Sequence, residues 1–171
     1  MPRHIAFLRG VSPLNLKMPD LKASLEQLGF ANVRTVLSSG NVAFNCDAAL
    51  AAELEQAIEA AVARQVGRHF PATVRRADAL TALLRTDPFA GFGLPAQAKR
   101  VVSFLREVRE PKSTLPLTEG SATVLRQIGA EVFTAYLPGP DGPVFMKLIE
   151  RAYGTAVTTR TWDTVAKCAV A

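Results

Sequence analysis

Hydrophobic and polar positions along the first 76 residues predict the order strand, helix, strand, strand, helix, strand. Residues 5–8 (IAFL) form a continuous apolar run, which is typical of a central strand covered on both faces. Residues 32–45 (NVRTVLSSGNVAFN) hold two apolar runs around Ser-Ser-Gly-Asn, and this pattern predicts a hairpin. The order is that of a ferredoxin-like βαββαβ unit, in which two helices cover one face of a four-stranded sheet.

The two helices of this unit are predicted from apolar side chains at helical spacing. The first begins at Pro19, carries leucine at every third or fourth position and ends at Gly29. The second follows Asp47, which we expect to be its N-cap, and continues to Gly67. The short apolar run at residues 72–74 then predicts the fourth strand.

The remainder of the chain predicts a second set of similar elements. A helix over residues 78–85 leads into a loop that contains glycine and proline. The elements after it are expected in the order strand, hairpin, helix and C-terminal helix: residues 101–105, 122–137, 144–152 and the segment after Thr159 or Thr161, either of which can cap the last helix.

Two strands, IAFLR at residues 5–9 and VSFLR at residues 102–106, resemble each other, and a hairpin and a helix follow each. An internal duplication explains this likeness; chance is the alternative, because buried strands share an apolar composition. We therefore expect an α/β (α+β) fold in three parts. These are a ferredoxin-like half at residues 1–76, a helix and connecting loop at 77–98, and a second α/β half with a C-terminal helix at 99–171; the halves can also form one compact domain.

Composition limits the partners without choosing one. The chain has 171 residues, of which 49% are hydrophobic and 20% charged, so it can bury a core. Its net charge of +5 favours anionic and phosphate-bearing partners. The basic residues are scattered, and only Arg75-Arg76 and Lys99-Arg100 are adjacent, so a nucleic acid is an alternative that the sequence does not favour.

The sequence lacks the motifs that identify several classes of function. Cys46 and Cys168 lack the CxxC spacing of a metal or redox site, and no P-loop, GxGxxG or HExxH is present, so we expect no metal and no cofactor. No apolar run approaches the roughly 20 residues that cross a bilayer, so no membrane partner is expected. The start of the chain lacks the features of a leader peptide, which predicts a cytoplasmic protein, either monomer or homodimer.

The predicted strand order, 4-1-3-2, indicates where polar residues meet. In that order the end of the first strand lies beside the hairpin turn and beside the start of the fourth strand. The residues expected at this edge of the sheet are Arg9, Gly10, Ser39, Gly40, Asn41 and His69. The hypothesis is an anion site, in which Arg9 pairs with a phosphate or carboxylate, the turn donates hydrogen bonds, and Arg160 closes the site from the C-terminal segment.

Other interpretations of this edge remain open. Ser-Ser-Gly-Asn is also ordinary turn chemistry, and Arg9 can form a salt bridge. An enzyme of unknown reaction would use Ser39 as nucleophile and His69 as base, although no G-x-S-x-G elbow surrounds the serine. A third alternative is a homo-oligomeric interaction protein, because a strand that is apolar on both faces needs cover. The sequence does not decide whether the protein is an enzyme.

Three segments together carry a resemblance to a known family. They are FLRG at residues 7–10, LKASLEQLGFANVRTVLSSGNVAF at 21–44 and LIERAYGTAVTTRTWDTVAK at 148–167. In this order they resemble the bacterial family called domain of unknown function 1697. The resemblance implies a compact α/β protein of similar length, and it implies no particular activity.

The chain departs from the family pattern at three places. Residues 11–15 (VSPLN) replace a loop that is usually rich in asparagine and glycine, and Gly142-Pro143 stands where a Ser-Lys pair is typical. Thr161 and Asp163 replace two asparagines of the C-terminal motif. If the family has a polar ligand site built from these groups, we expect it to be altered or lost in this chain.

Overall fold

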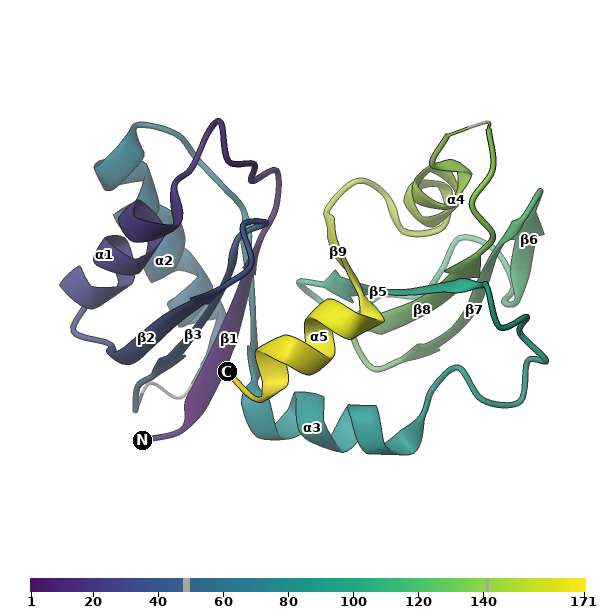
Figure 1. Cartoon of the computed structure of the whole chain (residues 1–171), viewed down its shortest axis with the longest axis horizontal. Helices are drawn as coiled ribbons and strands as arrows, with labels where there is room; N and C mark the ends of the chain where they lie inside the picture. The colour runs from purple at the N-terminus through teal and green to yellow at the C-terminus, as the bar shows by residue number, and fades with distance from the viewer. Residues whose placement is uncertain (48–49, 141) are drawn as a thin grey trace. The chain divides into compact units, whose positions relative to one another are not determined.

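The computed structural model describes residues 1–47, 50–140 and 142–171, which form an α+β protein with two antiparallel sheets and five helices (Figure 1). The predicted fold class is therefore confirmed. Contacts divide the chain into two units, Met1–Leu83 with Val165–Ala171, and Leu84–Thr164. The segment Val165–Ala171, which the sequence places in the second half, thus groups with the first unit. Within the described residues, no helix is long and apolar enough to cross a membrane.

The first unit has the predicted order of elements and the predicted order of strands. Its sheet is β2-β3-β1-β4, and every neighbouring pair is antiparallel. Helices α1 and α2 contact each other and lie on one face of this sheet (Figure 1). The elements are β1 (Arg3–Leu8), α1 (Met18–Gln27), β2 (Ala31–Val36), β3 (Asn41–Asn45), α2 (Ala51–Val66), β4 (Ala72–Arg76) and α3 (Ala77–Thr86).

Strand β1 is the centre of the first unit. All side chains of residues 5–8 are fully buried, because successive side chains of a strand point to opposite faces and both faces are covered. Ala6 and Leu8 point to the helices, where they belong to a core cluster with Leu21, Leu25 and Ile58. The apolar run that predicted a central strand is thus confirmed.

At the start of β1, Arg3 forms hydrogen bonds with several elements of the first unit. Its guanidinium donates hydrogen bonds to the carbonyl oxygens of Ala171, at 2.6 Å, and Asn32, at 3.1 Å, and also to the side-chain oxygen of Asn45. One cation therefore joins β1 to β2, β3 and the segment after α5.

The start of α2 differs from the prediction. The helix begins at Ala51, with Leu50 in the N-cap position and no side-chain cap, so the assignment of Asp47 as N-cap was wrong. The Asp47 carboxylate lies instead 3.9 Å from the amino group of Met1. Residues 48–49 are outside the described part of the chain. The end of the helix is as predicted, because Gly67 adopts the left-handed conformation that ends helices.

The second unit contains two strands that the sequence analysis did not separate. Its sheet is β6-β7-β8-β5-β9, again antiparallel throughout. The unpredicted strands are β6, which has three residues, and β9, which has five and is rich in threonine. The elements are β5 (Lys99–Leu105), β6 (Leu117–Glu119), β7 (Ala122–Ile128), β8 (Glu131–Tyr136), α4 (Val144–Tyr153) and β9 (Val157–Thr161). Helix α5 (Trp162–Ala169) begins in this unit and continues into the first.

The cap of α5 resolves an alternative that the sequence left open. The Thr161 hydroxyl accepts a hydrogen bond from the Thr164 amide at 3.2 Å, so Thr161 rather than Thr159 caps the helix. Thr159 instead shares a 2.7 Å hydrogen bond with the Ser103 hydroxyl across β5 and β9.

The two sheets repeat one pattern. The order β7-β8-β5-β9 corresponds to β2-β3-β1-β4, so β5 takes the place of β1. Where each central strand ends, its last amide donates a 2.8 Å hydrogen bond to a turn, from Leu8 to Gly40 and from Leu105 to Ala130. A connecting segment with β6 replaces α1 in the second unit. This correspondence is what an internal duplication predicts, and the duplication itself stays a hypothesis.

A glycine substitution tests the close approach at the hairpin turn. Gly40 has φ +89°, and a Cβ on it would lie 2.8 Å from Cγ2 of Val11. We expect Gly40→Ala to lower the free energy of unfolding by about 2–4 kcal/mol, as a left-handed penalty plus a steric clash. Denaturant unfolding measures the loss.

Gly10→Ala is the matched control for this substitution. Gly10 has φ +80°, but a Cβ on it would meet no atom within 4 Å. It should cost about 1 kcal/mol, from the conformation alone. Equal losses for the two variants would contradict the packing of Val11 on Gly40.

Candidate functional site

The end of β1 assembles the main chain of the predicted edge. The Leu8 amide donates to the Gly40 carbonyl at 2.8 Å, and the Arg9 amide donates to the Pro71 carbonyl at 2.9 Å. Arg9, the hairpin turn and the segment before β4 therefore meet at one end of the sheet, as the predicted strand order requires.

The side chain of Asn41 is used to build the turn. Asn41 is fully buried, and its Nδ2 donates to the Val36 carbonyl and to the Ser39 hydroxyl, both at 2.9 Å. These bonds close the hairpin across its connection, where Leu37 takes a positive φ of 58°. Asn41 therefore holds the shape of the turn, while the Ser39 side chain is exposed at its tip.

The loop after Arg9 is compact although it lacks the glycines of the family pattern. Asn15 donates from Nδ2 to the Gly10 carbonyl at 2.8 Å and accepts the Ser12 amide at 2.8 Å. Val11 packs against Gly40. The Asn15 amide thus organises residues 10–16, with Arg9 half-buried and Gly10 exposed at its start.

Two further predicted site residues have partners of their own. The His69 side chain is 63% exposed, and its Nε2 lies 3.8 Å from Oε2 of Glu59 on α2. Arg160 belongs to the second unit, where it is opposite Val102 in the sheet and donates from Nη1 to the Thr159 carbonyl at 3.0 Å.

A hollow of about 400 Å³ surrounds His4 in the first unit. His4 is 5% exposed and stacks on Phe44, with 5.5 Å between ring centroids. Its pKa lies below the usual value of 6.5, because burial disfavours the imidazolium and Arg76 repels it. Arg76 is itself paired with Asp78 at 2.8 Å.

Another hollow is an open groove of about 740 Å³ in the second unit. One wall is the segment after β5, and hydrogen bonds join it to β7 and to the end of α4. Arg109 donates to the Tyr153 carbonyl at 2.6 Å, Gln127 donates to the Arg109 carbonyl at 2.9 Å, and the Tyr153 hydroxyl donates to Gln127 at 2.8 Å. Burial, and then Glu110, raise the pKa of Tyr153 to about 12. Glu110, Lys112 and Arg126 all line the groove, so its charged side chains are of both signs.

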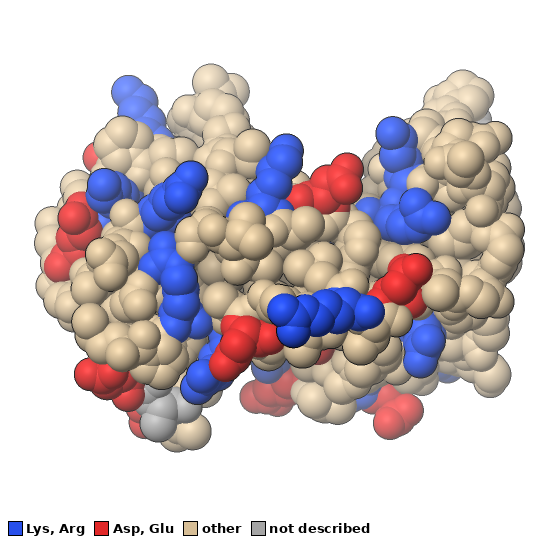
Figure 2. Space-filling view, turned by 60° about the horizontal axis from the view of Figure 1, so that its bottom comes forward, with Lys and Arg blue, Asp and Glu red and all other residues tan. Residues whose placement is uncertain are grey.

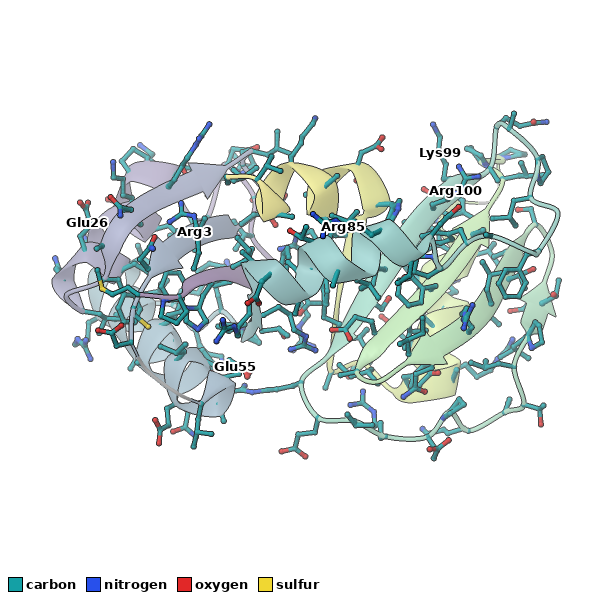
Figure 3. The ribbon with its side chains drawn as sticks, turned by 90° about the horizontal axis from the view of Figure 1, so that it is seen from below. Arg3, Glu26, Glu55, Arg85, Lys99 and Arg100 are labelled. Carbon is teal, nitrogen blue, oxygen red and sulfur yellow. The ribbon has the colours of Figure 1, made fainter. Side chains whose placement is uncertain are left out.

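A smaller hollow of about 360 Å³ lies at the start of β5, and we call it the β5 pocket. Strand β9 pairs with β5 only as far as Val101, opposite Thr161, and the chain then turns into α5. Lys99 and Arg100 therefore extend beyond the last partner in β9, and Figure 3 shows the two side chains at the same end of the sheet. The pocket is lined by Ala96, Ala98, Lys99, Arg100, Tyr136, Thr161, Trp162 and Asp163.

Aromatic rings form the apolar part of the β5 pocket. Tyr136 is opposite Lys99 in the sheet, and its ring stacks on Phe145 with centroids 4.0 Å apart and planes 6° apart. Trp162 is half-buried and meets the rings of Phe89 and Phe133 at steep angles, at 5.3 and 5.8 Å. Trp162 is thus an anchor of the local core, as the sequence suggests, and also a wall of the pocket.

The cations of the β5 pocket are exposed. Neither Lys99 nor Arg100 forms an ion pair with an acidic side chain in the described part of the chain. The Arg100 guanidinium lies 6.0 Å from the centroid of the Phe89 ring. The face drawn in Figure 2 carries both basic and acidic side chains.

Sequence reasoning noted Lys99-Arg100 only as an adjacent basic pair. The available signal was the position of this pair, directly before a buried strand. The other members of the β5 pocket come from β8 and α5, which only the fold brings together. Across residues 1–47, 50–140 and 142–171, no cluster of three or more His, Cys, Asp or Glu could hold a metal ion.

Comparison with known proteins identifies the family of this chain. Residues 1–133 match the family model described as protein of unknown function (DUF1697), so the chain belongs to this family. The predicted membership is confirmed, and the β5 pocket draws on residues from both the matched part and the part beyond it. A search of curated proteins finds no match.

A solved structure supports the fold over the whole chain. It is the conserved bacterial protein SP0830 from Streptococcus pneumoniae, which is 17% identical and has a TM-score of 0.71. The similarity covers 99% of this chain and 97% of the other. At this identity the likeness extends to the fold alone.

The lowered pKa of His4 predicts a loss of stability in acid. The unfolded chain takes up a proton near pH 6.5, whereas folded His4 resists it, so the free energy of unfolding falls as the pH drops below about 6.5. Thermal melts at pH 7.5 and pH 5 should show that His4→Phe, which keeps the stacking on Phe44, loses less stability in acid than the parent.

His69→Gln is the control for the acid effect. His4 and His69 are the two histidines of the chain, and His69 is mostly exposed. His69→Gln should therefore leave the acid loss nearly unchanged. An acid loss that disappears in His69→Gln but persists in His4→Phe would contradict this account.

Proposed function

We propose that this protein binds a small anionic ligand that carries a phosphate group. The observation that carries the proposal is the β5 pocket, where the exposed residues Lys99 and Arg100 both line a hollow of about 360 Å³. A volume of this size is in the range of small-molecule sites. An arginine provides a planar fork and a lysine a mobile point charge, and phosphate sites use both.

The geometry of the strands supports this location. Lys99 and Arg100 lie before the first residue of β5 that pairs with β9, so a ligand can approach them without breaking the sheet. The net charge of +5 adds long-range attraction for anions.

The edge formed by Arg9 and the turn at residues 38–41 is the second location for the same function. Its support is the convergence of main-chain segments at the end of β1, where Arg9 and the Ser39 side chain belong to neighbouring segments. The β5 pocket has the stronger support, because its two cations line one hollow, whereas Asn41 is committed to the turn.

Thermal shift with simple phosphates tests the proposed function. Inorganic pyrophosphate and ribose 5-phosphate at about 100 times their Kd should add about 2.7 kcal/mol of stability, which raises the melting temperature by about 5 °C or more. Arg100→Ala and Lys99→Ala should each weaken binding about tenfold, through loss of a charge-assisted hydrogen bond. High salt should weaken binding by the parent protein.

Two further variants locate the site. Lys22→Ala removes the same charge from an exposed position on α1 and should leave affinity nearly unchanged. Arg9→Ala should do the same if the ligand binds in the β5 pocket. If only Arg9→Ala weakens binding, the site lies at the end of β1. If no phosphate shifts the melting temperature at low salt, the proposed function is overturned.

A further inference from the structure

We infer that the ligand of the β5 pocket is a nucleotide unit, a phosphate joined to a sugar and an aromatic base; this rests on the proposed function of that pocket. Three kinds of group line it together: the cations Lys99 and Arg100, the carboxylate of Asp163, and the rings of Tyr136 and Trp162. Each kind matches one part of a nucleotide.

The two cations alone would bind any phosphate, but the carboxylate of Asp163 makes the pocket less suitable for a phosphate that carries no other group. The side chain of Asp163 would repel a bare phosphate, and it accepts hydrogen bonds from hydroxyl or amino groups. A sugar hydroxyl or a base N–H provides such a donor, whereas the oxygens of a doubly ionised phosphate ester only accept. An acidic group near the sugar is a known feature of nucleotide sites on other folds.

The aromatic rings supply the surface for a base. The Tyr136 ring stacks on Phe145 with nearly parallel planes, so a base on Tyr136 would extend an existing aromatic stack. Trp162 is fixed by Phe89 and Phe133 through steep ring contacts, which hold it in place at little entropic cost on binding. Stacking on such rings tolerates every base, because each base has an aromatic face.

The open end of β5 determines the direction of the ligand. Lys99 is opposite Tyr136 and shares its face of the sheet, whereas Arg100, the next residue, points to the other face, where it lies over Phe89. Trp162 and Asp163 begin α5, directly after the Thr161 that pairs with Val101. We therefore place the phosphate at the end of β5, between Lys99 and Arg100, and the base against Tyr136 on the face that carries Lys99.

The single tryptophan of the chain allows a direct test. The experiment titrates the full chain with adenosine monophosphate, ribose 5-phosphate, inorganic pyrophosphate and a short single-stranded oligonucleotide. Intrinsic fluorescence and calorimetry follow the binding. We expect the nucleotide to bind about tenfold or more tightly than ribose 5-phosphate, as base stacking predicts, and to quench Trp162.

Substitutions at Tyr136 separate stacking from general packing. Tyr136→Leu should remove most of the advantage of the nucleotide over ribose 5-phosphate and should leave the affinity for pyrophosphate nearly unchanged. Tyr136→Phe keeps the ring and should keep the advantage. If Tyr136→Leu weakens nucleotide and pyrophosphate equally, or if Tyr136→Phe behaves like Tyr136→Leu, the stacking role is overturned.

The ligand series distinguishes the outcomes. Equal affinity for nucleotide, sugar phosphate and pyrophosphate would overturn the nucleotide inference and leave the proposed function standing, whereas no binding of any of them would overturn both. Tighter binding of the oligonucleotide than of the mononucleotide, with a steeper salt dependence, would identify a single strand as the source of the unit. Tighter binding of the mononucleotide would identify a free nucleotide.

Discussion

The structure depends on the burial of a central strand on both faces. Residues 5–8 of β1 are fully buried, and so are Val102, Phe104 and Leu105 of β5. A strand that is apolar on every side chain is stable only if a neighbouring strand pairs with each edge and other elements cover each face. The order of strands in both sheets, with β1 or β5 between two partners, satisfies the first of these needs.

The same constraint places the functional groups at the ends of the strands. No side chain in the middle of β1 or β5 is accessible to a ligand, so polar and charged groups collect where the pairing stops. At the end of β1 these are Arg9 and the hairpin turn, and at the start of β5 they are Lys99 and Arg100. The two locations differ in one respect. The side-chain amide of Asn41 donates hydrogen bonds that close the turn, whereas the cations of the β5 pocket are exposed.

Sequence reasoning succeeded where the pattern is local or the strand is fully apolar. It predicted the order of elements in the first unit, the order of its strands and the family, because apolar periodicity and the Gly-Asn turn signal these directly. It failed at β9, whose threonines carry little apolar signal, and at the start of α2, where an acidic residue resembled a cap. The β5 pocket was beyond its reach, since Lys99, Tyr136 and Trp162 are far apart in the chain and meet only through strand pairing and the turn into α5.

The central claim is that the β5 pocket, rather than the end of β1, receives the phosphate group. Nuclear magnetic resonance of the isotope-labelled chain, titrated with inorganic pyrophosphate, tests this claim at the level of single residues. The account predicts that the largest changes in amide chemical shift fall on Lys99, Arg100 and residues 161–163. Changes concentrated on Arg9 and residues 38–41, or no changes at millimolar pyrophosphate in low salt, would contradict it.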